Sequence, residues 1–253
     1  MTGCTLADLA WPDVAARSAR SLLVVALGAT EQHGHHLPIG TDTLVAGELA
    51  GELARRRSDV VLAPPLAYGA SGEHAGFPGT LSIGTEATAV VLVELVRSAD
   101  AFRGVVLVNG HGGTTDAVAS ACEQVRAEGR SVLAWSPAAA VADGAERAGG
   151  PADAHAGWVE TSMVLAVAPA LVRVADAVAG DVRPLHAVMP DLRERGIGGV
   201  SPNGVLGDPS GASAAAGHAL LQACVADLLA AVTDRFGPPP RQPAAHRGSQ
   251  PGA

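Results

Sequence analysis

The chain has 253 residues, of which 48% are hydrophobic and 17% charged, and its formal net charge is −8. This composition supports a substantial core, which excludes a globally disordered chain, and the acidic balance leaves no electrostatic footprint for nucleic acid. No apolar run reaches about 18 residues, so we expect no membrane span, and no basic segment at the amino terminus leads into a long apolar run, so we expect no signal peptide. Three widely spaced cysteines without a CxxC pair predict free thiols and a cytoplasmic location.

Short valine-rich runs alternate with helix-like runs along most of the chain. Strands are predicted over residues 22–27, 60–63, 105–108 and 132–135, and helices over 43–57, 86–101, 115–128, 159–167 and 210–236. This alternation indicates an α/β fold with a mainly parallel sheet and helices on both faces. Residues 64–84, 137–157 and 181–207 are predicted as long, irregular connections. We expect one domain over 1–236, followed by a Pro-rich disordered tail over 237–253.

The first group of candidate site residues follows the strand predicted over 22–27. Gly28 ends the apolar run, and residues 31–42 contain Glu31, His33 and Asp42. Ligands of open α/β sheets bind at the carboxyl ends of strands, which is where these side chains emerge. Glu31 and His33 are two residues apart, so in extended backbone both point to one side. Asp42 or Thr41 can also serve simply as a helix cap.

Two later segments place similar chemistry at loop ends. His111 lies in the glycine-rich run 109–113 after the strand predicted over 105–108, and Glu160 lies about one turn into a helix that follows His155. Each residue has an ordinary alternative, because His111 can be a hydrogen-bonded core imidazole and Glu160 a surface charge. Carboxylates and imidazoles together suit a borderline divalent cation. Their joint occurrence therefore predicts a two-metal hydrolase site that Asp42 bridges.

Several motifs in the same order resemble the creatininase family of amidohydrolases. They span about residues 22–165, and the resemblance extends to about residue 220. The resemblance implies a three-layer α/β/α sandwich around a mainly parallel sheet, a homo-oligomer that is commonly a hexamer, and a dinuclear centre. The matching segments are Gly28-Ala29-Thr30-Glu31-Gln32-His33-Gly34, Glu73-His74-Ala75-Gly76-Phe77-Pro78-Gly79-Thr80, Asn109-Gly110-His111-Gly112-Gly113 and His155-Ala156-Gly157-Trp158-Val159-Glu160-Thr161-Ser162.

The same resemblance implies roles for individual residues. Glu31, Asp42 and His111 would hold one metal, and His33, Asp42 and Glu160 the other. His155, or else Glu73, would carry the proton to the leaving amine. The candidate substrate-binding residues are His36, His74 and Trp158, although a core or oligomer contact is the more ordinary role of Trp158.

The chain departs from the family pattern at a few positions. Creatinine-hydrolysing members carry a glutamate one residue beyond the equivalent of Gly112, where this chain has only glycine, and Glu160 is the nearest substitute. His35 stands where the family usually has proline, and Thr114 where it often has asparagine. Neither is a proposed ligand, but His35 lies where it can alter the rim of the pocket or the metal preference.

Further segments, such as Ala67 to His74 and Gly204 to Pro209, resemble the branch of the family that acts on a ribosomally made, modified precursor peptide. That resemblance implies removal of a modified carboxy-terminal Val-Tyr dipeptide through attack of a metal-bridging hydroxide. Two alternatives stay open: a small-molecule amidohydrolase for creatinine or a formamide, and a catalytically silent metal-binding oligomer. Ligation by oxygen and nitrogen allows Zn²⁺, Fe²⁺ or Mn²⁺.

Overall fold

The computed structural model describes residues 4–151 and 153–240. Its centre is a five-stranded parallel sheet in the order β1-β3-β2-β4-β5. The strands are β1 (Cys4–Thr5), β2 (Leu22–Leu27), β3 (Val60–Leu62), β4 (Gly104–Asn109) and β5 (Val132–Trp135). The parallel sheet confirms the predicted fold class, and the four strands predicted from the sequence are all present.

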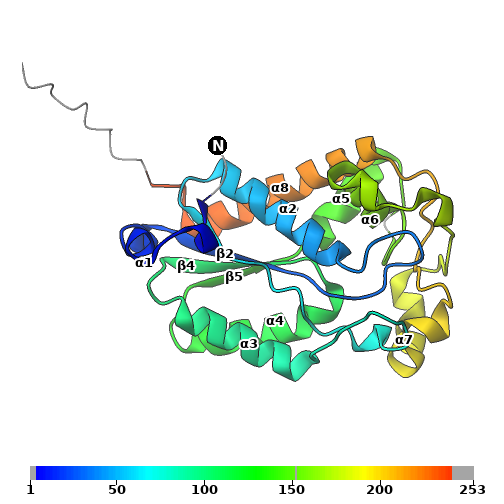
Figure 1. The fold of residues 1–253 in the computed structure, drawn as a ribbon, viewed down its shortest axis with the longest axis horizontal. Coiled ribbons are helices and arrows are strands. Elements are labelled where there is room, and N and C mark those ends of the chain that lie inside the picture. Colours follow the sequence, from blue (N-terminus) through cyan, green and yellow to red (C-terminus); the bar gives the residue numbers. More distant parts are fainter. Residues whose placement is uncertain (1–3, 152, 241–253) are drawn as a thin grey trace, which may run out of the picture.

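The helices form a layer on each face of the sheet (Figure 1), which completes the expected α/β/α sandwich. One layer contains α2 (Thr41–Arg56), α5 (Ala138–Ala148), α6 (Trp158–Val167) and α8 (Ala214–Phe236), and the other contains α3 (Thr85–Ser98) and α4 (Thr115–Ala127). The short α1 (Trp11–Ala15) lies at one end of the molecule, and α7 (Leu185–Val200) lies at the opposite end.

Alternate residues of β2 belong to different halves of the core. Leu22, Val24 and Ala26 pack in the cluster beneath α2, α6 and α8. Leu23, Val25 and Leu27 pack in the cluster beneath α3 and α4. Because successive side chains of a strand point to opposite faces, an uninterrupted apolar run fits a strand buried on both sides.

Two stretches predicted as irregular contain helices, so those predictions were wrong. Within 137–157 the chain forms α5, where Gly144 permits close packing: a Cβ there would lie 3.2 Å from Leu220 of α8. Within 181–207 it forms α7, which is broken at Gly196 (φ 64°) and also contains Pro190. Glycine and proline made these stretches look irregular in the sequence. In the structure Gly144 lies at a contact between two helices, and Gly196 lies at a kink within one helix.

The carboxy-terminal helix α8 is long and apolar enough by length and composition to cross a membrane. In the structure it packs against α2, α5 and α6, and Leu220, Leu228 and Val232 are fully buried in the core. The tail predicted over 237–253 lies outside the described residues from 241 onward. Cys4, Cys122 and Cys224 carry free thiols, as expected.

Candidate metal centre

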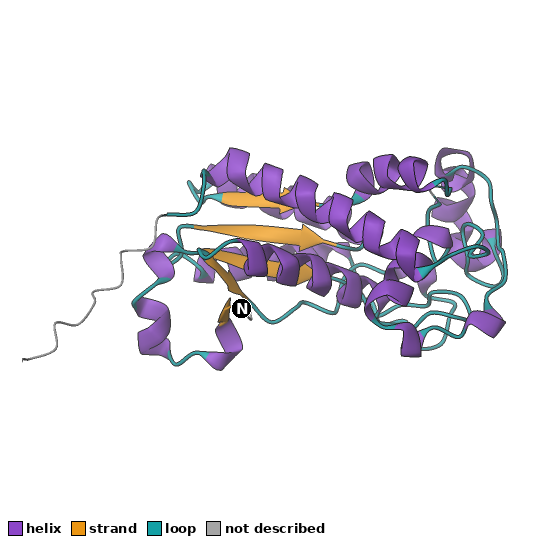
Figure 2. Ribbon diagram, turned by 90° about the horizontal axis from the view of Figure 1, so that it is seen from above, coloured by secondary structure: helices purple, strands orange, loops and turns teal. Residues whose placement is uncertain are grey.

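Loops gather beyond the carboxyl ends of the strands (Figure 2). The five candidate ligands come from this edge of the sheet, and their ligand atoms lie close together. Glu31 and His33 lie in the loop after β2, Asp42 in the first turn of α2, His111 after β4, and Glu160 in the first turn of α6. The first four are at most 4% exposed, whereas the side chain of Glu160 is 24% exposed. Parallel strands bring their carboxyl ends together, which explains why residues distant in sequence converge here.

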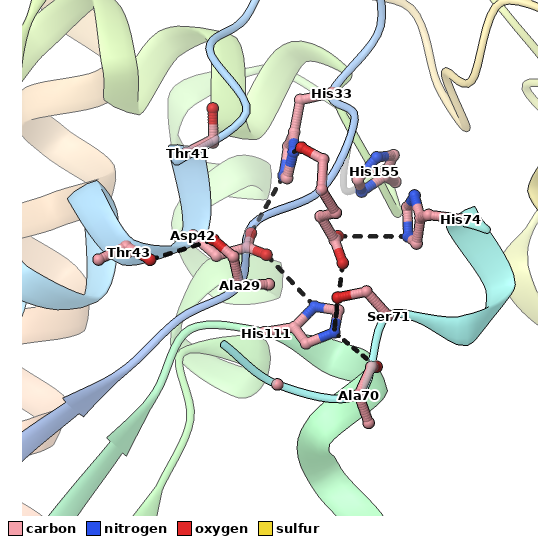
Figure 3. Close-up of polar contacts among 12 residues, drawn as sticks. Ala29, His33, Thr41, Asp42, Thr43, Ala70, Ser71, His74, His111 and His155 are labelled. Carbon is pink, nitrogen blue, oxygen red and sulfur yellow. Dashed lines mark hydrogen bonds and ion pairs between the residues drawn. The ribbon is translucent and has the colours of Figure 1, made fainter. Parts of the chain in front are cut away.

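The side chains form two groups that share Asp42. The first consists of Glu31, Asp42 and His111, and the second of His33, Asp42 and Glu160; within each group the ligand atoms lie within 4.8 Å of one another. The Oδ1 atom of Asp42 is 3.1 Å from Nε2 of His33, and its Oδ2 atom is 3.3 Å from Nδ1 of His111 (Figure 3). Asp42 does not cap α2, because Gly40 is the N-cap residue and no side chain caps there.

Main-chain carbonyls orient both imidazoles of these groups. The Nδ1 atom of His33 is 3.1 Å from the carbonyl oxygen of Glu31, and the Nε2 atom of His111 is 2.9 Å from that of Ala70. A ring nitrogen that faces a carbonyl oxygen must carry a hydrogen. The other ring nitrogen of each histidine faces Asp42: in the neutral imidazole it carries the lone pair that a metal needs, and when protonated it donates to Asp42 instead.

Burial and charge shift the pKa values of these groups strongly. Burial, followed by the nearby charge of Asp42, raises the pKa of Glu31 to about 8, and burial raises that of Glu160 to about 7. Burial alone lowers the pKa of His33, but Asp42, Glu160 and Glu31 outweigh it and raise this pKa to about 10. Despite its burial, Asp42 has a lowered pKa because His33 and His111 stabilise its charge.

The donor set fits a pair of divalent cations. Two buried carboxylate oxygens, Oε2 of Glu31 and Oδ2 of Asp42, accept no well-formed hydrogen bond from the described residues, although a ring nitrogen of His111 lies 3.3 Å from each. Leaving such atoms unpaired in the interior costs free energy unless a positive charge faces them. Three carboxylates and two oriented imidazoles supply oxygen and nitrogen ligands of the kind that zinc, iron and manganese accept.

Metal binding should release protons, because cations and protons compete for the same atoms. At pH 7.5 the pKa values of His33 (about 10), His111 (about 9) and Glu31 (about 8) keep these groups wholly or partly protonated, and a cation requires them unprotonated. We expect about two to three protons to be released per protein, and zinc affinity to rise as pH increases from 6 to 9. Calorimetry in buffers of different ionisation enthalpy measures the release; affinity that falls with rising pH would contradict this arrangement.

The two buried histidines His74 and His155 lie beside the ligand groups. Nε2 of His74 is 3.2 Å from Oε1 of Glu31, and the ring centroid of His155 is 4.3 Å from that of His33. Burial, followed by the charges of His33 and His111, lowers the pKa of His74 to about 3. Burial, followed by His33 and His74, lowers the pKa of His155 well below its usual range. Both imidazoles are therefore neutral at pH 7.

The carboxylate of Glu73 occupies space that Gly113 leaves open. A Cβ atom at position 113 would overlap Oε1 of Glu73 and the carbonyl oxygen of Ala70, and would lie 2.7 Å from Nε2 of His111. Glu73 and His111 therefore approach the same point from different loops. The residue that follows Gly112 must be a glycine for both side chains to keep these positions.

Replacing Gly113 by alanine should disturb the centre. We expect Gly113→Ala to destabilise the fold by about 1–3 kcal/mol and to weaken zinc binding, because the added methyl displaces His111 or Glu73. Gly112→Ala is the matched control, since no atom of the described residues lies within 4 Å of a Cβ at that position. Chemical unfolding and zinc titration of both variants test this. Equal stability and equal zinc affinity of the two variants would show that Glu73 and His111 do not need the space that Gly113 leaves open.

A cavity of about 750 Å³ opens beside the ligand groups, with Asp42, His111 and Glu160 in its wall. Its remaining wall comes mainly from residues 136–142, 182–185 and 206–208. The described residues that line this cavity do not include the three candidate substrate-binding residues. His36 is bonded to Thr161 (2.8 Å), His74 faces Glu31, and Trp158 is packed in the core with its Nε1 3.2 Å from the Gly211 oxygen. The geometry thus fits the ordinary, structural role of Trp158.

Sequence reasoning missed two residues that shape the centre. Asp153 accepts hydrogen bonds from the main-chain N–H groups of Trp158 and Val159, and so fixes the start of the helix that carries Glu160. Gln32 contacts both His74 and His155. Its place between Glu31 and His33 in the sequence was the available signal, whereas nothing in the sequence marks Asp153.

Comparisons with known proteins are consistent with this geometry. A family model described as creatinine amidohydrolase matches residues 7–232. A protein of Mycolicibacterium smegmatis named mycofactocin precursor peptide peptidase is 44% identical over 221 residues, which cover 85% of this chain and 84% of that protein. A solved mutant creatininase described as Zn-Zn type has a TM-score of 0.78 at 27% identity, covering 94% of this chain and 100% of the other. A structure described as "Creatininase Mn" has a TM-score of 0.77, also at 27% identity, with 93% and 100% covered.

Proposed function

Because this chain belongs to the creatininase family, we propose that it is a metal-dependent peptidase of the mycofactocin system. Its substrate would be the ribosomally made, modified precursor peptide, from which it removes the modified carboxy-terminal Val-Tyr dipeptide. The observation that carries the chemistry is the pair of ligand groups joined by Asp42. The observation that carries the substrate is the 44% identity to a peptidase over most of both chains.

Each of the candidate residues has a chemical task in this proposal. Glu31, Asp42 and His111 would hold one divalent cation, and His33, Asp42 and Glu160 a second. When bound, such a pair acidifies water and polarises the amide carbonyl. Neutral His155 can accept a proton from the attacking water and return it to the leaving amine. Glu73, whose carboxylate lies beside His111, is the second candidate for that transfer.

The cavity suits the leaving group of this reaction. Its volume of about 750 Å³ lies within the range that holds small organic ligands. Val45, Val141, Met163 and Leu206 contribute apolar side chains close to Asp42 and Glu160. These side chains can contact the hydrophobic parts of the modified dipeptide, while Asp153, Arg183 and Asp208 of the same lining can contact its polar groups.

The test is incubation of the purified, metal-loaded protein with cross-linked and uncross-linked precursor peptides, followed by mass spectrometry. We expect cleavage before the modified dipeptide only in the cross-linked peptide. Hydrolysis of creatinine or a formamide with the peptide intact would instead favour the small-molecule amidohydrolase, which the likeness to solved creatininases supports. A metal-loaded protein inert toward all of them would favour the silent metal-binding oligomer.

The proposal also covers the identity of the metal, the oligomeric state and the cellular compartment. Zn²⁺ or Fe²⁺, with Mn²⁺ as an alternative, would occupy the centre, which the oxygen and nitrogen ligands support. We further propose a homo-oligomer, a hexamer by family likeness, in the cytoplasm. The free thiols of Cys4, Cys122 and Cys224 support a reducing compartment.

A further inference from the structure

The side chain of Gln32 is buried and contacts both His74 and His155, the two histidines beside the ligand groups. Its Nε2 atom lies 2.9 Å from Nδ1 of His74 and 3.0 Å from the carbonyl oxygen of Gly204. Its Oε1 atom accepts a hydrogen bond of 2.8 Å from the main-chain N–H of Gly34. Only 7% of Gln32 is exposed, so these contacts replace water.

Two main-chain groups fix which end of the Gln32 amide is nitrogen. If the amide were reversed, its oxygen would face the carbonyl oxygen of Gly204, and its nitrogen would face the N–H of Gly34. Both contacts would then oppose groups of the same kind, acceptor against acceptor and donor against donor. The amide nitrogen therefore faces His74, and because an amide nitrogen can only donate, Nδ1 of His74 must offer a lone pair.

This contact determines where the single proton of neutral His74 lies. With a lone pair on Nδ1, the hydrogen is on Nε2, which is 3.2 Å from Oε1 of Glu31. His74 thus presents an N–H to a candidate metal ligand, as partners of ligating carboxylates do. The two hydrogens of the Gln32 amide are both used, one by His74 and one by Gly204.

The main chain of Gln32 has the corresponding effect on His155. Nε2 of His155 is 2.9 Å from the carbonyl oxygen of Gln32, which can only accept. The same ring atom lies 3.2 Å from the amide nitrogen of Gln32, but both hydrogens of that amide are directed elsewhere, at His74 and Gly204. The carbonyl oxygen is therefore the bonding partner, and a hydrogen of His155 is on Nε2. Nδ1 is then the ring nitrogen of His155 that this contact leaves free.

We propose that Gln32 is a positioning residue that fixes the tautomers of both histidines, through its side-chain amide for His74 and its main-chain carbonyl for His155. The inference rests on the proposed function, because it gives the orientation of Glu31 and the ring nitrogen of His155 that is left free for that reaction. Gly204 is part of the arrangement: a Cβ at this position would overlap the Gln32 amide.

The test reads the tautomers directly, by long-range ¹H–¹⁵N correlation on the zinc-loaded, ¹⁵N-histidine-labelled full chain. His74→Asn and His155→Asn variants assign the two ring signals. We expect both histidines to carry hydrogen on Nε2. An Nδ1–H signal for either would overturn the inference, and this readout depends on neither substrate nor activity. Failure of the wild-type protein to cleave the precursor peptide would overturn the proposed function instead.

Gln32→Glu, which replaces the amide by a carboxylate of the same shape, tests the side chain alone. We expect Nδ1 of His74 to gain a hydrogen while Nε2 keeps the one that faces Glu31, His155 to stay unchanged, and kcat to fall about 10-fold or more with a smaller change in KM. Gln124→Glu on the exposed face of α4 is the control for the added charge. An unmoved His74 signal would overturn the inference. If Gln32→Glu does not fold, Gln32→Met decides: a His74 that keeps only its Nε2–H form there also overturns it.

Discussion

Asp42→Asn should reduce turnover by about 10³-fold or more and lower the metal content, while leaving the fold intact. Asp42 is the one residue that belongs to both ligand groups, with one carboxylate oxygen directed at His33 and the other at His111. An amide keeps the shape of the side chain but loses its charge and one of its two acceptor atoms. Peptide cleavage, metal analysis and circular dichroism on the same preparation measure the three effects.

Asp116→Asn is the matched control for this substitution. Asp116 lies in the first turn of α4, as Asp42 lies in the first turn of α2, but it is exposed and belongs to neither ligand group. It carries the same charge change at the same helical position, so it should retain activity and metal. Normal metal content together with normal turnover in Asp42→Asn would exclude a bridging role for Asp42.

His155→Gln should lower kcat by about 10²- to 10⁴-fold, the usual contribution of a general acid or base, without loss of metal. His155 is a neutral imidazole beside His33, and its Nε2 atom is bonded to a main-chain oxygen rather than to a carboxylate of the two ligand groups. Glu73→Gln, measured in parallel, shows which of the two carries the proton, because the larger loss identifies the carrier.

Metal content distinguishes this role from ligation. One ring atom of His155 also lies within 4.8 Å of ligand atoms of Glu31 and His33, so a metal-binding role is the competing interpretation. Loss of a cation in His155→Gln would support that interpretation and contradict proton transfer. His218→Gln, on the exposed face of α8, controls for the loss of an imidazole.

The architecture could be predicted from the sequence because local patterns agree with it. The apolar run of β2, buried on both faces, and the alternation of strands with helices lead directly to a parallel sheet. The helices α5 and α7 were missed because glycine and proline occur both in loops and at contacts or kinks of helices. Gly144 allows contact with α8 and Gly196 forms a kink, and these roles depend on tertiary packing that the sequence does not display.

Part of the candidate site could likewise be predicted from the sequence, and part could not. Glu31, His33, Asp42 and His111 follow strands or begin a helix, so topology predicts that they meet. The closeness of Glu73 to His111 and the contacts of Gln32 depend on the path of residues 64–84 and 201–207. Such paths are set by many weak contacts among distant segments, and short motifs carry little information about them.

The wall of the cavity comes largely from a different part of the chain than the ligands do. The ligands lie at the ends of β2 and β4 and at the start of α2 and α6, whereas residues 136–142, 182–185 and 206–208 form most of the remaining lining. Substitutions in these outer segments can change which molecules fit without moving a single coordinating atom. Substrate preference and bond-breaking chemistry can therefore evolve separately, which offers a route to redesigning one while keeping the other.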